Sequence, residues 1–468
     1  MSCKKSRRAY QLSLLQTASI IMVTIPVLWE HPLLVLKRNL DWPGILDVLV
    51  RYLRASGRNV DHGPGRPLEL NLYMPIIVLM HLKNLNSRQM EEYLAENGPA
   101  RAFIDWEDSI QLQVRDHSNL ARIMDSLGED GKKDLNGLIL RHAVELGFAD
   151  PSKLSGDTTA QELPIGYPHE AGILEGLAKR VLRTVKKLAS KGKHGLSEAQ
   201  AQCETIIGKA KEYHLFAKVK VEKTKLLNEM VQGSEILMEK ARKLITGLSE
   251  DTDKVVTSAR GRLLQMVDVG EHLLPQILYW LKTGFVAKGK IIHAGINKAR
   301  SIVRNKPGKK VEFGLQYLLC MLGGGYLFGE VIEKPTGETK MPLKCLSGYR
   351  GIFGEEQTPE MITYDRGGWS KPNVKMLAKE GIKKVGIQPK GQASWAVNEQ
   401  DQKLVMSERG KMEGKIGTLK SDKYGFNKPK ERTWQTVCAA GQKSIISLNL
   451  NKLMRDLVNR EEKIMVTV

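Results

Sequence analysis

A short, mostly apolar run that ends at an acid marks the C-terminal half of the chain. Met361 to Tyr364 forms the run, and Asp365, Arg366 and two glycines follow at once. This is the pattern of a buried strand that brings a carboxylate to a sheet edge and then turns. Such a carboxylate typically holds a metal or handles a proton. The alternative is an aspartate that ends a strand and caps the next helix.

Other strands are predicted on both sides of this one. Lys310–Leu322 and Tyr326–Glu333 flank three glycines and predict a hairpin, and Lys384–Pro389 predicts a further strand. Upstream, the β-branched pair Thr158-Thr159 follows Asp157 and favours a strand there. We therefore expect a sheet assembled from distant segments.

Helical periodicity dominates residues 31–150. Leu72–Leu82 and Ser87–Glu96 are amphipathic runs around a tight turn at Asn84–Asn86, with Asn86 or Ser87 as the cap of the second run. A DNA-binding helix-turn-helix and a plain helical hairpin both fit this pattern. The other predicted helices are Asn119–Leu127, Asp134–Leu146, Pro342–Gly351, Asn373–Glu380, Gln400–Gly425 and Thr433–Leu457.

A lysine- and glutamate-rich region extends from Leu174 to about Ile302. Apolar residues recur there at three- and four-residue steps, which predicts long amphipathic helices, including an antiparallel pair that turns near 248–253. Their lysines are typical of a solvated face, and contact with DNA is the alternative.

The order of elements predicts the fold class. Strand, helical insertion, hairpin, helix, strand, helix, strand and helix match an α/β, RNase H-like mixed sheet flanked by helices, behind an all-helical N-terminal domain. The predicted parts are 1–150 (helical N-terminal, DNA-binding), 151–173 (first core strand and loop), 174–305 (helical insertion after that strand) and 306–468 (remainder of the catalytic domain).

The net charge of the chain indicates a class of binding partner. The 468-residue chain has 72 lysines and arginines against 52 aspartates and glutamates, a net charge of +20 spread over most of its length. Such a surplus favours a nucleic-acid partner, because each cation laid on a phosphate releases a counterion. Simple solubility is the alternative interpretation.

Two features bear on location. The five cysteines are far apart and form no C-x-x-C pair, which fits a reducing cytoplasm. Leu12–Trp29 has no charge and resembles a membrane anchor or signal peptide, but polar residues interrupt it. We expect a helix buried against the first domain and no membrane association; a membrane-associated helical protein is the minor alternative.

Three acids have the chemistry of a phosphodiester-cleaving site. Two divalent ions can activate a nucleophile and stabilise a leaving oxygen, and Mg²⁺ prefers a few carboxylates. Asp157, Asp365 and Glu413 meet this requirement if the fold unites them, and Mn²⁺ would substitute for Mg²⁺. Glu408 is a rival that we expect to point elsewhere.

Basic residues lie close to Glu413 in the sequence. Arg409 and Glu413 are four residues apart and share a helix face, and Lys420 follows about two turns later. Arg409 could grip a DNA phosphate in bidentate fashion and Lys420 could anchor another, although an ordinary solvated ion pair also fits. Arg366 and Lys415 are further candidates for DNA contact. Trp369 and Trp395 could stack on a base, but core packing is the simpler expectation.

At these residues the chain resembles bacterial insertion-sequence DDE transposases of the insertion-sequence-five group. The similar segments are D-T-T-A-Q-E with Y-P (Asp157–Glu162, Tyr167-Pro168), V-E-F-G (Val311–Gly314), Y-D-R-G-G (Tyr364–Gly368) and R-G-K-M-E-G-K-I-G-T-L-K-S-D (Arg409–Asp422). At the front, H-P-L (His31–Leu33), D-W (Asp41-Trp42), G-R-P (Gly65–Pro67) and Leu82–Met90 match in order. The likeness covers about residues 31–457.

This resemblance implies an RNase H-like core with Asp157, Asp365 and Glu413 as metal ligands. It also implies an N-terminal domain that recognises the terminal inverted repeats of the element. We therefore expect a cytoplasmic, nucleoid-associated transposase, at least dimeric on DNA, that cleaves the element ends and joins them to target DNA. A catalytically inactive or domesticated DNA-binding relative is the alternative.

Overall fold

The computed structural model describes most of the chain. The described residues are 30–60, 68, 70–105, 117–306, 309–334, 336–391, 393–395 and 397–467. The predicted helix at Leu12–Trp29 lies outside these ranges, as does the whole G-R-P segment (Gly65–Pro67). Within them, no helix is both long and apolar enough to cross a bilayer.

The described part of the chain begins with a group of helices, in agreement with the helical periodicity of residues 31–150. Asp41 caps the second helix through Gly44 N–H at 3.0 Å, and Asn86 forms a capping box with Gln89, as the turn chemistry predicts. The helices are α2 (Pro32–Asn39), α3 (Trp42–Ala55), α4 (Leu70–Leu82), α5 (Ser87–Glu96), α6 (Gly98–Phe103), α7 (His117–Leu127) and α8 (Asp130–Glu145).

A six-stranded mixed sheet forms the centre of the molecule. Its strands are β1 (Asp150–Glu162), β2 (Arg300–Lys306), β3 (Lys309–Gly323), β4 (Tyr326–Val331), β5 (Met361–Tyr364) and β6 (Lys384–Ile387). The order β2-β3-β1-β5-β6 has β1 central, antiparallel to β3 and parallel to β5, and β5 parallel to β6. β2 and β4 both pair antiparallel with β3, at 309–314 and 317–322 respectively. The hairpin prediction is confirmed, and β2 is a strand that the sequence pattern did not predict.

Alternation along β3 divides the sheet into two buried faces. Leu318, Cys320 and Leu322 pack in one cluster with α13 (Met341–Phe353) and the N-terminal helices. Tyr317, Leu319 and Met321 face the other way, toward α15 (Glu399–Leu419) and the first half of α16 (Trp434–Thr467). Outside the insertion between β1 and β2, the other elements are the helix α14 (Lys371–Lys379) and the 3₁₀ turns η2 (Glu338–Lys340) and η3 (Arg366–Gly368).

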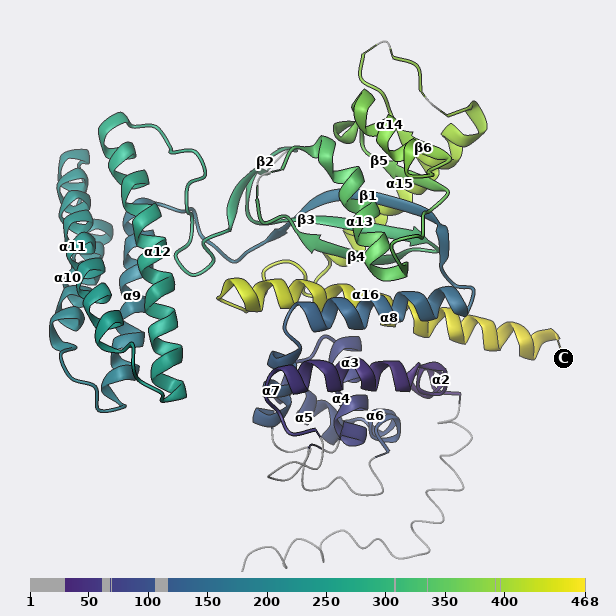
Figure 1. Ribbon diagram of the computed structural model, residues 1–468, viewed down its shortest axis with the longest axis horizontal. Helices are drawn as coiled ribbons and strands as arrows, with labels where there is room; N and C mark the ends of the chain where they lie inside the picture. The colour runs from purple at the N-terminus through teal and green to yellow at the C-terminus, as the bar shows by residue number, and fades with distance from the viewer. Residues whose placement is uncertain are drawn as a thin grey trace, which may run out of the picture.

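Helix α16 joins the sheet to the N-terminal helices (Figure 1). Its buried polar side chains reach across: Asn451 Nδ2 donates to Leu82 O at 2.7 Å, and Asn449 Nδ2 donates to Asn136 Oδ1 at 2.7 Å. One hydrophobic cluster runs from Leu33 to Leu457 through both parts. The N-terminal helices therefore share a core with the sheet.

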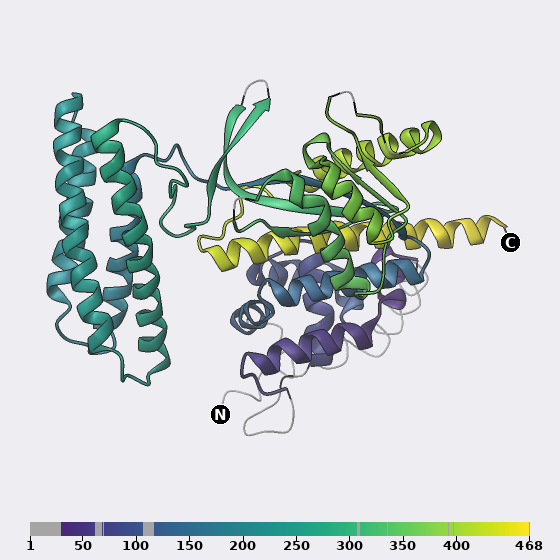
Figure 2. The same cartoon turned by 45° about the horizontal axis from the view of Figure 1, so that its top comes forward.

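The insertion between β1 and β2 is a separate helical bundle (Figures 1 and 2). It consists of α9 (Glu170–Ala189), α10 (Ser197–Leu215), α11 (Lys220–Gly247) and α12 (Lys254–Thr283), with a hydrophobic cluster largely its own. The turn predicted near 248–253 is present, with Asp253 capping α12. The antiparallel pair α11–α12 is thus part of a four-helix unit.

Candidate active site

The central strands bring two of the predicted acids side by side. Ser155 on β1 is in register with Thr363 on β5, and the two hydroxyls are hydrogen-bonded at 2.8 Å. Asp157 and Asp365 each follow two residues later, and a step of two residues returns to the same side of a strand. Because β1 and β5 are parallel neighbours, both carboxylates lie next to each other on the same face of the sheet.

The third acid comes from the helix that covers this face of the sheet. Helix α15 packs on β1, β5 and β6, and Val405 lies against Gly386 of β6. Arg409, Met412 and Glu413 occupy one stripe of α15, as an i, i+3, i+4 spacing requires. Met412 is buried in the cluster beneath, which turns Arg409 and Glu413 toward the strands.

The three acids line one cavity of about 110 Å³, with Gly156, Thr363, Arg409 and Met412 as its other walls. Asp157 and Asp365 are half-buried, whereas Glu413 is exposed. A volume of this size holds a few water molecules. The carboxylates are 208 and 48 residues apart in sequence, so only the fold assembles the cavity.

Asp365 carries the clearest sign of a missing partner. Its Oδ1 is buried without a hydrogen bond among the described residues, and its side chain does not cap η3. Asp157 Oδ1 accepts from Thr158 N–H at 2.7 Å. A buried carboxylate oxygen without a partner is costly unless an ion or a water molecule fills its position.

Tyr364 precedes Asp365, and its ring lies against Gly156, the neighbour of Asp157. Burial raises the pKa of Tyr364, and the charges of Cys345, Asp365 and Asp157 raise it further. Both carboxylates are thus close enough to Tyr364 to affect its pKa, although burial is the larger cause.

The donor set fits a hard cation, but the carboxylates are not gathered around one point. Among the described residues, no group of three or more histidine, cysteine, aspartate or glutamate side chains is close enough together to hold a metal ion. Glu413 is exposed on a helix, where its χ angles are free to change. Binding of one ion by all three carboxylates would therefore require them to come closer together than they lie here.

Glu338 is an acid near this cavity that the sequence pattern did not indicate. A methyl group built on Gly367 would collide with Glu338 Oε2 and would lie 3.1 Å from Asp365 Oδ1. The two carboxylates thus border the same small space beside η3. Glu338 lies in a polar stretch before α13, where no apolar run or spacing marks it as functional.

The remaining predicted residues have different positions. Glu408 is buried and paired with Lys411 at 2.6 Å, outside the cavity, as we expected of this rival acid. Arg366 is exposed in η3, and Lys420 is the C-cap residue of α15. Lys415 lies against Gly325 in the β3–β4 turn, where burial and the nearby Lys452 lower its pKa. It does not line the cavity.

The two tryptophans near Asp365 differ in their surroundings. Trp369 is half-buried and packs against the main core, as the simpler expectation had it. Trp395 is half-buried, and its Nε1 has no partner among the described residues.

The predicted helix-turn-helix segment forms two helices, but its second helix is acidic. Helix α4 is buried along most of its length, and α5 carries Glu91, Glu92 and Glu96 against Arg88. The turn between them is anchored to the rest of the fold, since Asn84 Nδ2 donates to Tyr424 O at 2.9 Å. Only the first turn of α5 has a charge suited to DNA.

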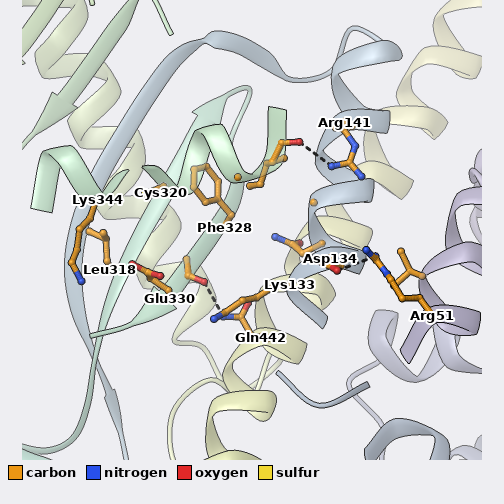
Figure 3. Close-up of a pocket in the computed structure, with 17 residues that line it drawn as sticks. Arg51, Lys133, Asp134, Arg141, Leu318, Cys320, Phe328, Glu330, Lys344 and Gln442 are labelled. Carbon is orange, nitrogen blue, oxygen red and sulfur yellow. Dashed lines mark hydrogen bonds and ion pairs between the residues drawn. The ribbon is translucent and has the colours of Figure 1, made fainter. Parts of the chain in front are cut away.

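A second cavity, of about 380 Å³, lies among α3, α8, the β3–β4 hairpin and α13 (Figure 3). Its polar groups largely satisfy one another: Arg51 pairs with Asp134 at 2.9 Å, Arg141 donates to Ile352 O at 2.9 Å, and Gln442 donates to Gly329 O at 2.8 Å. It is separate from the carboxylate cavity, and its arrangement favours a structural role at this junction.

No protein-family model, characterised protein or solved structure matches the chain. The carboxylate cavity and the charge around it are therefore the basis for any statement about function.

Proposed function

We propose that the protein is a metal-dependent DNA strand transferase, the transposase of an insertion sequence. The observation that carries the proposal is the single cavity lined by Asp157, Asp365 and Glu413, which come from two strands and a helix far apart in sequence. The buried unpaired Oδ1 of Asp365 supports a cation there.

The sheet supports an RNase H-like core. Antiparallel β1, β3 and β4 are followed by β5 and β6 parallel to β1, and the helical bundle interrupts the chain after β1. This is the arrangement expected from the order of sequence elements. The acids then come from the middle of the first core strand, the end of β5 and a late helix.

Each residue at the carboxylate cavity has its own proposed role. Asp157, Asp365 and Glu413 would hold Mg²⁺ or Mn²⁺, which activates the attacking oxygen and stabilises the leaving oxygen when bound. Arg409, on the same wall, would bind a phosphate oxygen of the cleaved strand and balance its charge. Glu338 would add a negative charge beside Asp365 and strengthen the attraction of the site for a cation.

The proposed partners are the terminal inverted repeats of the element and a target DNA. The net charge of +20 supports a polyanionic partner. Joining of two element ends makes at least a dimer on DNA part of the proposal. The first turn of α5 is the proposed contact with the repeats, since its only basic residue, Arg88, is exposed.

A plasmid excision assay tests the proposal, with the gene and its native flanking DNA on one plasmid. Asp157→Ala, Asp365→Ala and Glu413→Ala should each abolish cleavage and joining while DNA binding persists. Glu399→Ala is the matched control, because Glu399 is an exposed acid on α15 outside the cavity. Wild-type levels of excision by Asp365→Ala would refute the catalytic assignment.

A DNA-binding protein without catalysis is the second candidate. One observation favours it: the three carboxylates are not gathered into a metal-binding group among the described residues. DNA binding by the wild-type protein, with no excision under any divalent cation, would select this candidate.

A further inference from the structure

A wide groove, of about 760 Å³, lies where the helical bundle approaches the start of α16. One wall is the α9 stripe Arg180, Arg183 and Thr184, and the opposite wall is the α12 stripe from Ser258 to Val269. Residues 294–298 and 432–435 close the other sides. Arg180 Nη2 donates to Arg432 O at 2.8 Å and links the bundle to the segment before α16. In both overall views the first turn of α16 points toward the bundle (Figures 1 and 2).

The groove is strongly cationic. Its lining includes Asp268 as the single carboxylate, against the four arginines Arg180, Arg183, Arg262 and Arg432; the one lysine, Lys298, is paired with Glu333 at 2.7 Å. Arg183, Arg262 and Arg432 are exposed, and no described carboxylate forms an ion pair with any of them. Cations that converge from three separate segments without neutralising partners form a site for an anion.

The positive potential reaches the residues beneath the groove. Burial, and then the charges of Arg180 and Arg432, lower the pKa of His293 from 6.5 to about 4. Burial, and then the neighbouring Arg183, lowers the pKa of Arg180. Hydroxyl and amide groups of Ser258, Gln265, Asn297 and Thr433 add hydrogen-bonding capacity along the same lining.

The residues that line the groove favour binding of a phosphate backbone over binding of bases or of a peptide. Trp434 is the one aromatic residue of the groove, and Lys298 Nζ already sits 4.5 Å from its ring centre. The ring is therefore a poor platform for base stacking. The apolar residues Met266, Val269 and Ala294 are buried, so they offer no pockets for peptide side chains.

We propose that this groove binds the phosphate backbone of a DNA duplex whose end lies at the carboxylate cavity. The choice of DNA rests on the proposed function, whereas the choice of a duplex backbone rests on the lining of the groove.

The groove and the cavity lie over one buried cluster. Met412 lines the cavity and Trp434 lines the groove, and both pack in that cluster. Between them β1 continues from Asp157 to Glu162, which spans about 17 Å at 3.3 Å per residue. That length corresponds to about five base pairs at 3.4 Å each. The groove would thus contact DNA at least this far from the cleaved phosphate.

Binding of a labelled duplex to the full chain in EDTA tests the proposal without requiring cleavage. Arg183→Gln/Arg262→Gln removes two exposed cations from opposite walls. Lys211→Gln/Lys225→Gln is the matched control, because it removes two exposed charges from the same bundle outside the groove. Thermal melting checks that both variants fold.

We expect the groove variant to lower the slope of log K against log salt by about 1.8 and to weaken binding roughly 60-fold at about 0.1 M salt. The control should stay close to wild type. Equal losses in the two variants, or a loss seen with single-stranded DNA alone, would overturn the proposal. Asp365→Ala should bind the duplex like wild type. The excision assay therefore tests the catalytic assignment, whereas duplex binding by Arg183→Gln/Arg262→Gln tests the groove.

Discussion

Thr363 donates a buried hydrogen bond to Ser155 Oγ at 2.8 Å, directly between the two strands that carry Asp157 and Asp365. Both residues are almost fully buried, and each precedes its aspartate by two positions. This bond fixes the register of the parallel pair at the cavity wall.

Breaking one side of this bond should destabilise the fold. Thr363→Val leaves the Ser155 hydroxyl buried without this partner, and an orphaned buried group costs about 1–3 kcal/mol. Ser155→Ala/Thr363→Val removes both groups and should be more stable than Thr363→Val alone. Urea unfolding of the two single variants and the double variant measures the difference. Strictly additive losses would show that the bond contributes nothing.

Divalent ions should stabilise the folded protein through the carboxylate cavity. An ion at about a hundred times its dissociation constant adds about 2.7 kcal/mol to the free energy of unfolding, provided it binds only the native state. Melting in EDTA and in millimolar Mg²⁺ or Mn²⁺ should reveal this gain in wild type. It should disappear in Asp157→Asn/Asp365→Asn.

Asp422→Asn provides the control for this experiment, because Asp422 is exposed and does not line the cavity. It should keep the full gain in melting temperature. An equal gain in Asp157→Asn/Asp365→Asn would show that the ion binds elsewhere.

Glu338 should act as a supporting residue for Asp365. Glu338→Gln keeps the size of the side chain but removes the charge beside Asp365 Oδ1. Loss of an outer-shell partner typically weakens metal affinity by about 10–100-fold. We expect a higher Mg²⁺ requirement in the excision assay, with activity recovered at high Mg²⁺. Complete loss at every Mg²⁺ concentration would instead place Glu338 among the direct ligands.

The protein should lose stability in acid partly through His81. This side chain is fully buried in α4; its Nδ1 contacts Ile77 O at 2.8 Å, and Nε2 has no partner among the described residues. Burial, and then the charge of Lys132, lowers the pKa of His81 from 6.5 to about 3. The unfolded chain therefore binds a proton first, and stability falls as pH drops from 6.5 toward 3.

His81→Leu removes this titration at similar volume. Between pH 7 and pH 5 wild type should lose about 2 kcal/mol more free energy of unfolding than the variant. Urea unfolding at the two pH values provides the measurement. Parallel pH curves for the two proteins would show that another group is responsible.

Much of the secondary structure follows from local pattern. The capping chemistry of Asn86, the glycine turn at Gly323–Gly325 and the short run before Asp365 each predicted an element that is present. These signals are local, because a cap or a turn needs residue types within a few positions of each other. The strand β2 escaped prediction because its sequence, R-S-I-V-R-N-K, has few apolar residues, and one of them, Val303, is 74% exposed.

From the sequence alone, Asp157, Asp365 and Glu413 were candidates for metal binding because of their residue types, their neighbours and their resemblance to known segments. Only the tertiary structure decided that they line one cavity, that Glu338 borders it and that Lys415 does not. It also decided that arginines from α9, α12 and the segment before α16 share a groove. The physical reason is that strand register and helix packing join residues more than two hundred positions apart, and no local pattern encodes such a distance.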